Sequence, residues 1–323
     1  MSIDLGKIRG MQRVTSADGY FLICAIDHLS DFVELLGEGP DVGFRDVVAA
    51  KDAVVRAVAG TVSAVLLDPL YGLGHLVASG AVPATVGVVC SIEDEDYRHP
   101  PGPRRTRLRE GWRVEDIKRA GADLGKLLWY YRPDTAVADA QRQLVRDLVA
   151  SCAAIGLPLV VEPVWYPLPG EDPTGTAWRQ RRVDGIVASA AEVAGFGVDL
   201  LKVEFPGYVD TAEGRRSAAA ACAELAAAVP VPWVLLSAGV GYPDFRTQLE
   251  IACRAGASGY LAGRSVWRDA VVARDPAAIG QVRGRLAELN AITRSHGRPY
   301  SPTVTLDDAL AQLPERWYRS GHR

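Results

Sequence analysis

The chain has 323 residues, of which 48% are hydrophobic and 23% charged, the composition of an ordinary soluble enzyme with a large core. Its formal net charge of −3 argues against a nucleic acid as the main partner, because proteins that bind phosphate backbones carry a basic excess. The N-terminus has no apolar signal segment and no apolar run is long enough to span a bilayer, so a membrane is not an expected partner. The five cysteines are scattered without disulfide or zinc-ligand spacing, and we expect reduced thiols and a cytoplasmic protein.

Eight short apolar runs, rich in Val, Leu and Ile and bounded by turn residues, predict β-strands. They are Phe21–Ile26, Ala64–Leu67, Thr85–Cys90, Leu124–Tyr130, Leu157–Val161, Leu200–Val203, Trp233–Leu236 and Gly259–Ala262. Helical patterns lie between most of them, most clearly over Val47–Val58, Ala136–Ile155, Ser189–Gly195, Arg216–Ala228, Phe245–Ala255 and Val271–Leu289. Alternating strands and helices indicate parallel β/α units, and eight such units close into a TIM (β/α)8 barrel.

An open doubly wound sheet is the structural rival, but no G-x-G-x-x-G motif follows the first predicted strand. No linker or low-complexity segment interrupts the pattern, so we expect residues 1–323 to form a single TIM-barrel domain. The final stretch, Ala291 to Arg323, is expected to be a short C-terminal extension packed on the barrel.

Charged residues recur where the predicted strands end. In a TIM barrel, catalytic groups lie at the carboxyl ends of the strands and in the loops that follow. A charge at a buried strand end is costly unless it is paired or belongs to a site. In chain order these positions are Asp27, Asp68, Lys126, Glu162, Lys202 with Glu204, Ser237 and Arg264. Two lysines and several carboxylates converging on one rim indicate an active site.

Lys202 is the candidate nucleophile. Alternation along its strand places Leu200, Lys202 and Glu204 on one face, which points into the barrel. An amine among apolar walls, with a second cation at Lys126 nearby, is more easily neutral and able to attack a carbonyl carbon. The alternative is a purely structural ion pair, Lys202 with Glu204 or Lys126 with Glu162.

Three carboxylates allow two interpretations each. Glu162 is suited to general acid–base catalysis, or is only a salt-bridge partner. Asp27 and Asp68 can orient substrate hydroxyls or cap the next turn. Because Asp68 precedes Pro69, we favour Asp27 for function and a structural role for Asp68.

The loops after the last two predicted strands read LLSAGVG and LAGRSVW. Loops at these positions of a TIM barrel often bind phosphate through backbone N–H groups. Ser237, Ala238, Gly239 and Gly263 can offer such donors, and Arg264 adds a bidentate charge. Two ordinary β–α turns are the alternative, and the pairing at the correct two strands favours phosphate.

Metal chemistry is not expected, because the five histidines show no ligand spacing, and only His28, beside Asp27, is placed at the rim. The segment Glu93–Trp112 follows the third strand and should lie over the active-site face. Its arginines, at 104, 105, 107 and 109, could reach an anionic substrate end, although such a run is more often solvated surface. Trp165 and Tyr166, after the fifth strand, could wall the site or be ordinary packing.

Six segments carry a family resemblance: AVLLDPLYG, GKLLWYY, VVEPV, DLLKVEFP, VPWVLLSAGV and AGASGYLAGRSVW. In order and rough spacing, from near Phe21 to Trp267, they resemble the class I tagatose-1,6-bisphosphate aldolases and, more closely, the sulfofructosephosphate aldolases of the same superfamily. The resemblance implies a metal-independent, cofactor-free lyase that cleaves a ketose 1-phosphate between C3 and C4 to dihydroxyacetone phosphate and an aldehyde. It also implies a homo-oligomer, a dimer or a tetramer.

The resemblance further implies residue roles. Lys202 would be the Schiff-base lysine and Glu162 the proton shuttle. Asp27 and Lys126 would contact the substrate. The phosphate of the ketone half would be held by Ser237, Gly239, Gly263 and Arg264. Other Schiff-base lyases or dehydratases, and a non-catalytic sugar-phosphate sensor, are the alternatives.

One position departs from the family pattern. The first strand of the family usually ends Asp-Gln-Arg, whereas this chain reads Asp27-His28-Leu29. With Leu29 at this position, the chain lacks a guanidinium group suited to the distal phosphate or sulfonate of the substrate. Either the aldehyde half is unphosphorylated, or an arginine from another loop compensates.

Overall fold

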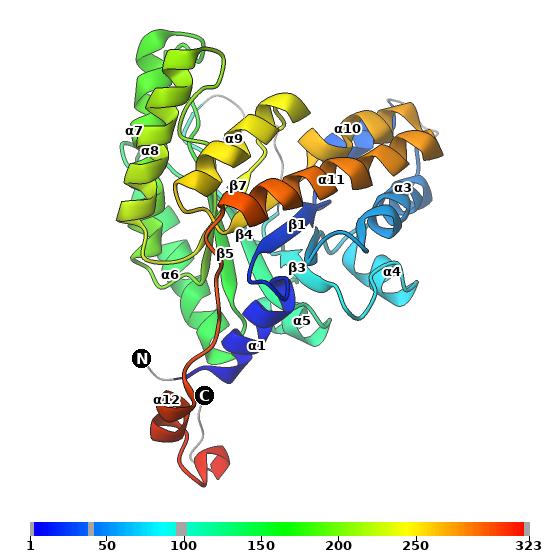
Figure 1. The fold of residues 1–323 in the computed structure, drawn as a ribbon, viewed down its shortest axis with the longest axis vertical. Coiled ribbons are helices and arrows are strands. Elements are labelled where there is room, and N and C mark those ends of the chain that lie inside the picture. The colour runs from blue at the N-terminus through cyan, green and yellow to red at the C-terminus, as the bar shows by residue number, and fades with distance from the viewer. Residues whose placement is uncertain (1–2, 38–41, 95–101, 320–323) are drawn as a thin grey trace.

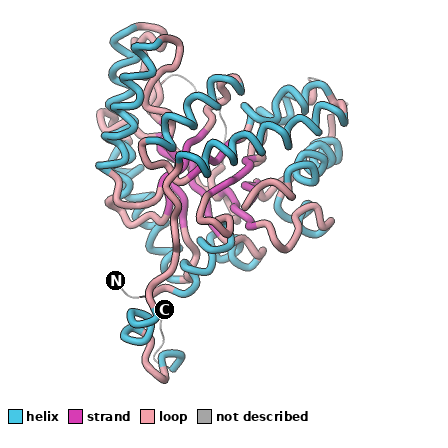
Figure 2. Tube along the Cα trace, viewed as in Figure 1, coloured by secondary structure: helices cyan, strands magenta, loops and turns pink. Residues whose placement is uncertain are grey.

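The computed structural model describes residues 3–37, 42–94 and 102–319. Eight parallel strands form a closed barrel in chain order, so the predicted TIM barrel is confirmed. Figure 2 shows the strands gathered at the centre with helices around them. The strands are β1 (Phe21–Ala25), β2 (Ala64–Leu67), β3 (Gly87–Ser91), β4 (Leu124–Tyr130), β5 (Leu159–Val164), β6 (Leu200–Val203), β7 (Trp233–Leu236) and β8 (Gly259–Ala262).

The strand lengths differ in a way that matters for the site. β4 has seven residues and continues to Tyr130, and β5 continues to Val164, three residues beyond its predicted end. Lys126 pairs in register with Ser91 of β3 and Val160 of β5, whereas Glu162 pairs with Leu128. Lys126 therefore lies in mid-strand, one layer deeper than Glu162. Its predicted position at a strand end is wrong.

The lower half of the barrel is filled by apolar side chains from the strands. Inward-facing residues such as Ile23, Val160 and Leu200 form one buried cluster, as alternation along a strand requires. Helix α1 (Leu5–Val14) adds Met11 and Val14 to that cluster and closes the end of the barrel opposite the carboxyl ends of the strands. Polar chemistry is thereby confined to the carboxyl end.

The outer layer consists of helices, several of which were predicted with shifted bounds. The helices between strands are α2 (Ser30–Leu35), α3 (Phe44–Val58), α4 (Leu73–Ala78), α5 (Val114–Arg119), α6 (Ala138–Ala154), α7 (Thr176–Ala194), α8 (Ala212–Ala228) and α9 (Tyr242–Arg254). The predicted helix Ser189–Gly195 is only the last part of α7, whose earlier turns carry many arginines that obscure the apolar periodicity.

The predicted helix Val271–Leu289 is wrong, because it is two helices. α10 (Arg264–Ala273) ends where Arg274 adopts a left-handed conformation with φ of 51°. α11 (Pro276–His296) begins with Asp275, whose side chain accepts a hydrogen bond from the backbone N–H of Ala277. An Asp N-cap followed by Pro is a strong start signal for a new helix.

The C-terminal extension packs on the barrel over only part of its length. Tyr300 stacks on Phe21 of β1, with ring centroids 5.6 Å apart. Helix α12 (Leu306–Gln312) and the 3-10 turn Trp317–Arg319 project beyond the closed end of the barrel (Figure 1), and no residue of α12 is buried. Leu306 is 74% exposed, so the expected packing does not hold for this helix.

A buried ion pair joins the ends of the first two strands. Lys51 of α3 is fully buried and donates to one carboxylate oxygen of Asp68, which is also fully buried. The same ammonium donates to the carbonyl oxygens of Ile26 and His28, at 2.9 and 2.8 Å. The other oxygen of Asp68 caps the turn that follows β2, accepting from the N–H groups of Leu70 and Tyr71. Asp68 therefore has the structural role that we favoured, and Lys51 fixes the backbone on both sides of Asp27.

We predict that Lys51→Met destabilises the fold by roughly 3–5 kcal/mol, because Asp68 is left as an uncompensated buried charge. Urea denaturation measures the change. The control is Arg56→Met on the same helix, which removes an exposed pair with Asp52 and should cost much less stability. Similar losses in the two variants would contradict a special role for Lys51.

Candidate active site

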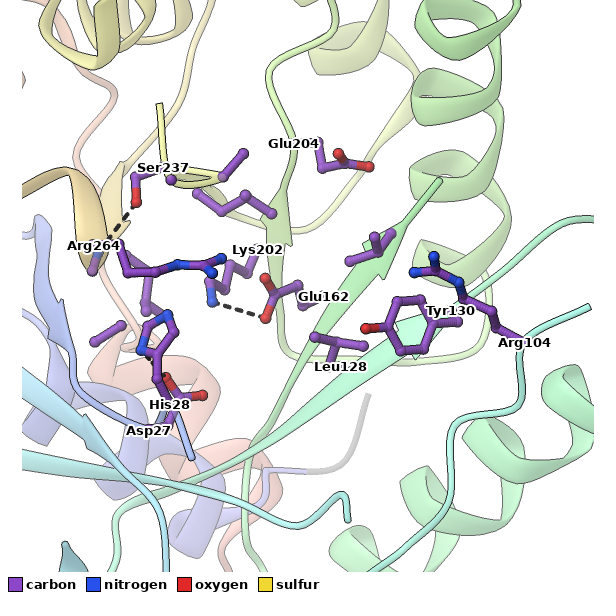
Figure 3. Close-up of a pocket in the computed structure, with 17 residues that line it drawn as sticks. Asp27, His28, Arg104, Leu128, Tyr130, Glu162, Lys202, Glu204, Ser237 and Arg264 are labelled. Carbon is purple, nitrogen blue, oxygen red and sulfur yellow. Dashed lines mark hydrogen bonds and ion pairs between the residues drawn. The ribbon is translucent and has the colours of Figure 1, made fainter. Parts of the chain in front are cut away.

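A cavity of about 220 Å³ opens at the carboxyl ends of the strands (Figure 3). Every residue predicted for the site lines this cavity except Lys126. These residues are Asp27, His28, Glu162, Lys202, Ser237, Gly239, Gly263 and Arg264. They come from five strands or the turns after them (β1, β5, β6, β7 and β8), so the closed barrel brings together side chains that lie far apart in the sequence.

Lys202 and Glu162 form a hydrogen-bonded pair in the cavity. The Nζ of Lys202, on β6, lies 2.8 Å from the Oε2 of Glu162, on the neighbouring strand β5. Each side chain is only 8% exposed, and apolar side chains of β7 and β8, Leu236 and Leu261, line the same cavity. An amine and a carboxylate at this distance can exchange a proton directly.

Lys126 lies beneath this pair and is held by three carboxylates. Its Nζ is 3.0 Å from the Oδ2 of Asp27, 2.5 Å from the Oε1 of Glu93 and 3.2 Å from the Oε2 of Glu162. Because three negative groups surround its charge, Lys126 acts less as a second cation beside Lys202 than the sequence suggested. The same Glu162 oxygen contacts both lysines.

Asp27 and His28 occupy the turn after β1. Burial alone would raise the pKa of Asp27, but the positive charges of Lys126 and Lys202 and a hydrogen bond from Lys126 outweigh burial and lower it. Burial lowers the pKa of His28 well below its ordinary value of 6.5, so the ring is neutral in the folded protein. The His28 ring packs edge-on against Trp267, with centroids 5.3 Å apart.

The two loops predicted to bind phosphate lie side by side. Ala238 and Gly239 have φ values of 45° and 72°, and the N–H of Val240 donates to the carbonyl of Ser237, so residues 237–240 form a tight turn. The Oγ of Ser237 accepts from the N–H of Gly263, at 3.3 Å. The positive φ at Ala238, a residue with a side chain, is unfavourable backbone geometry of the kind that is retained at functional sites.

Gly263 and Arg264 begin helix α10 at the cavity wall. A Cβ at Gly263 would lie 2.8 Å from the Cε1 of His28, so only glycine allows the ring this close. The guanidinium of Arg264 forms an ion pair with Asp31 of α2. The first N–H groups of α10 and a cation thus converge beside Ser237, the arrangement of an anion site at a helix N-terminus.

Glu204 does not pair with Lys202, so that alternative ion pair is wrong. One oxygen of Glu204 accepts from Arg182 of α7, at 2.8 Å, and the other from the backbone N–H of Trp165, at 2.8 Å. The second alternative pair, Lys126 with Glu162, does exist, but Glu162 is shared with Lys202.

Of the arginines at 104, 105, 107 and 109, Arg104 alone lines the cavity. Arg105 and Arg107 are exposed, and Arg109 forms an ion pair with Asp94 at 3.2 Å. Residues 95–101 of this segment lie outside the described residues. Trp165 and Tyr166 are buried and do not line the cavity, although the Tyr166 ring contacts Arg104.

Sequence reasoning missed Glu93 and Asp31, the partners of Lys126 and Arg264. Alternation along β3 carries the inward face from Val89 through Ser91 to Glu93, a signal that could have identified Glu93. Asp31 offered no comparable signal, because its contact with Arg264 joins positions 233 residues apart. Leu128, Tyr130 and Val164 also line the cavity. They do so because β4 continues beyond Lys126 and β5 continues beyond Glu162.

No group of three or more His, Cys, Asp or Glu side chains in the described part of the chain is arranged to hold a metal ion. Two of the five histidines, at 99 and 322, lie outside that part. The helices that the structure describes are all too short or too polar to cross a membrane.

The sequence matches known aldolases over most of its length. Residues 21–269 match the profile of the DeoC/LacD family aldolases. Tagatose 1,6-diphosphate aldolase 1 of Enterococcus faecalis is 28% identical over 280 residues, which cover 82% of this chain and 85% of the relative. Tagatose 1,6-diphosphate aldolase of Listeria monocytogenes serotype 4a is 28% identical over 292 residues, covering 84% of each chain.

Solved structures show the same fold at lower identity. An archaeal fructose 1,6-bisphosphate aldolase superposes with a TM-score of 0.62 at 19% identity, covering 87% of this chain and 98% of that one. The fructose-bisphosphate aldolase of Plasmodium falciparum gives 0.63 at 13% identity, covering 91% and 96%. The barrel, the lysine at its mouth and the sequence matches define a class I aldolase, a carbon–carbon lyase that works through a Schiff base. The chain belongs to the DeoC/LacD family of aldolases.

We predict that stability falls with pH below about 6.5 because of His28. The neutral folded ring cannot gain the proton that the unfolded ring gains below its ordinary pKa of 6.5, so falling pH favours unfolding. The slope approaches about 1.4 kcal/mol per pH unit for one proton. Urea denaturation at several pH values between about 5 and 7.5 should show a shallower slope in His28→Gln. Equal slopes in the wild-type protein and in His28→Gln would refute the assignment.

Proposed function

We propose that this enzyme cleaves a ketose 1-phosphate, of the tagatose-bisphosphate or sulfofructose-phosphate type, between C3 and C4. The products are dihydroxyacetone phosphate and an aldehyde. The observation that carries the proposal is the Lys202–Glu162 pair, 2.8 Å apart in the cavity at the barrel mouth. The relatives named as tagatose 1,6-diphosphate aldolases support a phosphorylated ketose as the substrate class.

The C1 phosphate would lie in the turns after β7 and β8. Gly239 and Gly263 allow the backbone to approach an anion closely, and the N-terminus of α10 directs N–H groups at it. Ser237 and Arg264 supply a hydroxyl and a guanidinium beside these amides. A phosphate bound there would bring the C2 carbonyl near Lys202, which lies between Arg264 and Glu162 in Figure 3.

The reaction begins when Lys202 passes a proton to Glu162 and attacks C2 as a neutral amine. Glu162 gives that proton to the C2 oxygen, which leaves as water, so that an iminium ion forms and Glu162 is again a carboxylate. Glu162 then removes the proton of the C4 hydroxyl, the C3–C4 bond breaks, and its electron pair moves into the iminium to give an enamine. The aldehyde leaves. Protonation at C3 and addition of water release dihydroxyacetone phosphate and restore Lys202.

The other buried charges prepare this chemistry. Lys126, which is hydrogen-bonded to Glu93 and Asp27, places its ammonium group beside Glu162 throughout the cycle. Asp27 and the neutral His28 line the cavity and are placed to orient substrate hydroxyls. Lys126 is fully buried, so we assign it the role of holding Glu162 and Asp27 in place. Those two carboxylates would contact the substrate directly.

We further propose a single domain over residues 1–323, a cytoplasmic location and a homo-oligomeric state. All five cysteines are buried and free, as expected in a reducing compartment. Size-exclusion chromatography with light scattering measures the oligomeric state directly.

We predict that Lys202→Met abolishes turnover, because it removes the amine that forms the iminium ion and leaves only Lys126 nearby, which three carboxylates hold. Release of triose phosphate from ketose 1-phosphates, with and without a 6-phosphate or 6-sulfonate, is the assay. Lys118→Met, the same change at an exposed lysine of α5, should retain wild-type activity. Normal activity in Lys202→Met would rule out the mechanism.

We predict that Glu162→Gln lowers kcat by about 10²–10⁴-fold with little change in KM, because the amide keeps the shape of the side chain but cannot accept a proton. Steady-state kinetics on the best substrate of the same panel provide the measurement. A kcat within about threefold of wild type would assign the proton transfer to another group.

A further inference from the structure

The cavity has a second cationic end that the proposed phosphate site does not use. Figure 3 shows Arg104 on the side opposite Arg264, with Lys202 and Glu162 between them. Leu29, which stands where the family usually has arginine, is absent from the cavity wall. Arg104 is thus a basic residue at the end of the cavity where the rest of a ketose chain would extend from Lys202.

Two aromatic rings hold the Arg104 side chain. The guanidinium carbon lies 5.1 Å from the ring centroid of Tyr130 and 5.1 Å from that of Tyr166. The Tyr166 hydroxyl also accepts the backbone N–H of Arg104, at 2.9 Å. Contact with ring faces fixes a guanidinium without neutralising it, and it leaves the N–H groups at its edge able to bind an anion.

The backbone beside Arg104 is anchored to the barrel. Thr106 is buried, and its Oγ1 accepts the backbone N–H of Tyr130 at 2.9 Å. The N–H of Thr106 donates to the Oε1 of Gln141 on α6, at 3.0 Å. Arg104 therefore sits on a fixed segment, although it comes from a long loop. A cation that is already ordered loses little entropy when it binds a ligand.

Local charges favour an anion at this end. Within the described residues, 3–37, 42–94 and 102–319, Arg104 forms no ion pair. Glu204 is the carboxylate that lines this side of the cavity, and Arg182 and the Trp165 N–H already bind its two oxygens. The positive charge of Arg104 is thus not cancelled by its surroundings.

We propose that Arg104 binds the anionic group on C6 of the substrate, a phosphate or a sulfonate. It would replace the arginine that the family usually has at the position of Leu29. The inference rests on the proposed function and makes it more specific: the substrate carries an anion at both ends. Arg104 is then the residue that determines specificity for the distal end, through a bidentate contact at the edge of its guanidinium.

Binding of unreactive analogues tests this assignment. Hexitol 1,6-bisphosphate, its 6-sulfonate counterpart and hexitol 1-phosphate lack a carbonyl, so they cannot form a Schiff base and their affinity is independent of catalysis. Isothermal titration calorimetry should show that the wild-type enzyme binds at least one of the two doubly anionic compounds about tenfold or more tightly than hexitol 1-phosphate. The tighter of the two identifies the C6 group.

Three variants isolate Arg104. Arg104→Gln should reduce the preference for the doubly anionic compound to within about threefold while leaving affinity for hexitol 1-phosphate unchanged. Arg104→Lys, which keeps the charge but loses the planar guanidinium and its bidentate contact, should give an intermediate preference. Arg105→Gln, at the exposed neighbour, should keep the full preference. Circular dichroism melting verifies that each variant is folded.

Two results would overturn the inference: equal wild-type affinity for the singly and doubly anionic analogues, or a full preference that survives in Arg104→Gln. A failure of the proposed function would give a different set of results. In that case wild-type protein and Lys202→Met would both lack aldolase activity, while calorimetry would still report whether Arg104 selects a second anion.

Discussion

The structure depends on how five ionisable groups are buried together inside the barrel. Lys126 contacts Asp27, Glu93 and Glu162, and Glu162 in turn contacts Lys202. Charges removed from water are stable only if each is paired, so every member of this cluster constrains its neighbours. The shared Glu162 oxygen has a particular consequence. When it takes a proton from Lys202, Lys126 is already in place beside it, and no rearrangement is needed between the steps of the proposed cycle.

The fold supplies this constraint in layers. Apolar residues and helix α1 seal the lower barrel, the buried charges occupy the layer above, and the cavity opens over them. Lys51 ties the turn that carries Asp27 to the end of β2 from outside the barrel. Arg264 and Arg104 then lie at opposite ends of the cavity, with Lys202 between them. In the proposed function, position along the cavity corresponds to position along the sugar chain.

The sequence was sufficient for the barrel and most of the site, for physical reasons. Short buried strands are apolar on both faces and stand out between helices, and charges at their ends mark the active-site rim. The predicted strand Leu124–Tyr130 already put Lys126 in mid-strand, and its depth relative to Glu162 follows from the register of β4 against β5, which the pattern does not give. Glu93 lies beside Lys126 because β3 and β4 are neighbours, whereas Asp31 meets Arg264 only because the barrel closes between β1 and β8. Arg104 could not be separated from its neighbouring arginines, because its selection depends on two tyrosine faces from β4 and the segment after β5.

The central claim is that the amine of Lys202, rather than the adjacent amine of Lys126, reacts with the carbonyl of the substrate. Incubation with dihydroxyacetone phosphate and sodium borohydride, followed by peptide mass spectrometry, distinguishes the two directly. We expect a reduced triose-phosphate adduct on the peptide that contains Lys202 and an unmodified peptide around Lys126. An adduct on Lys126, or no adduct on either lysine, would contradict the account.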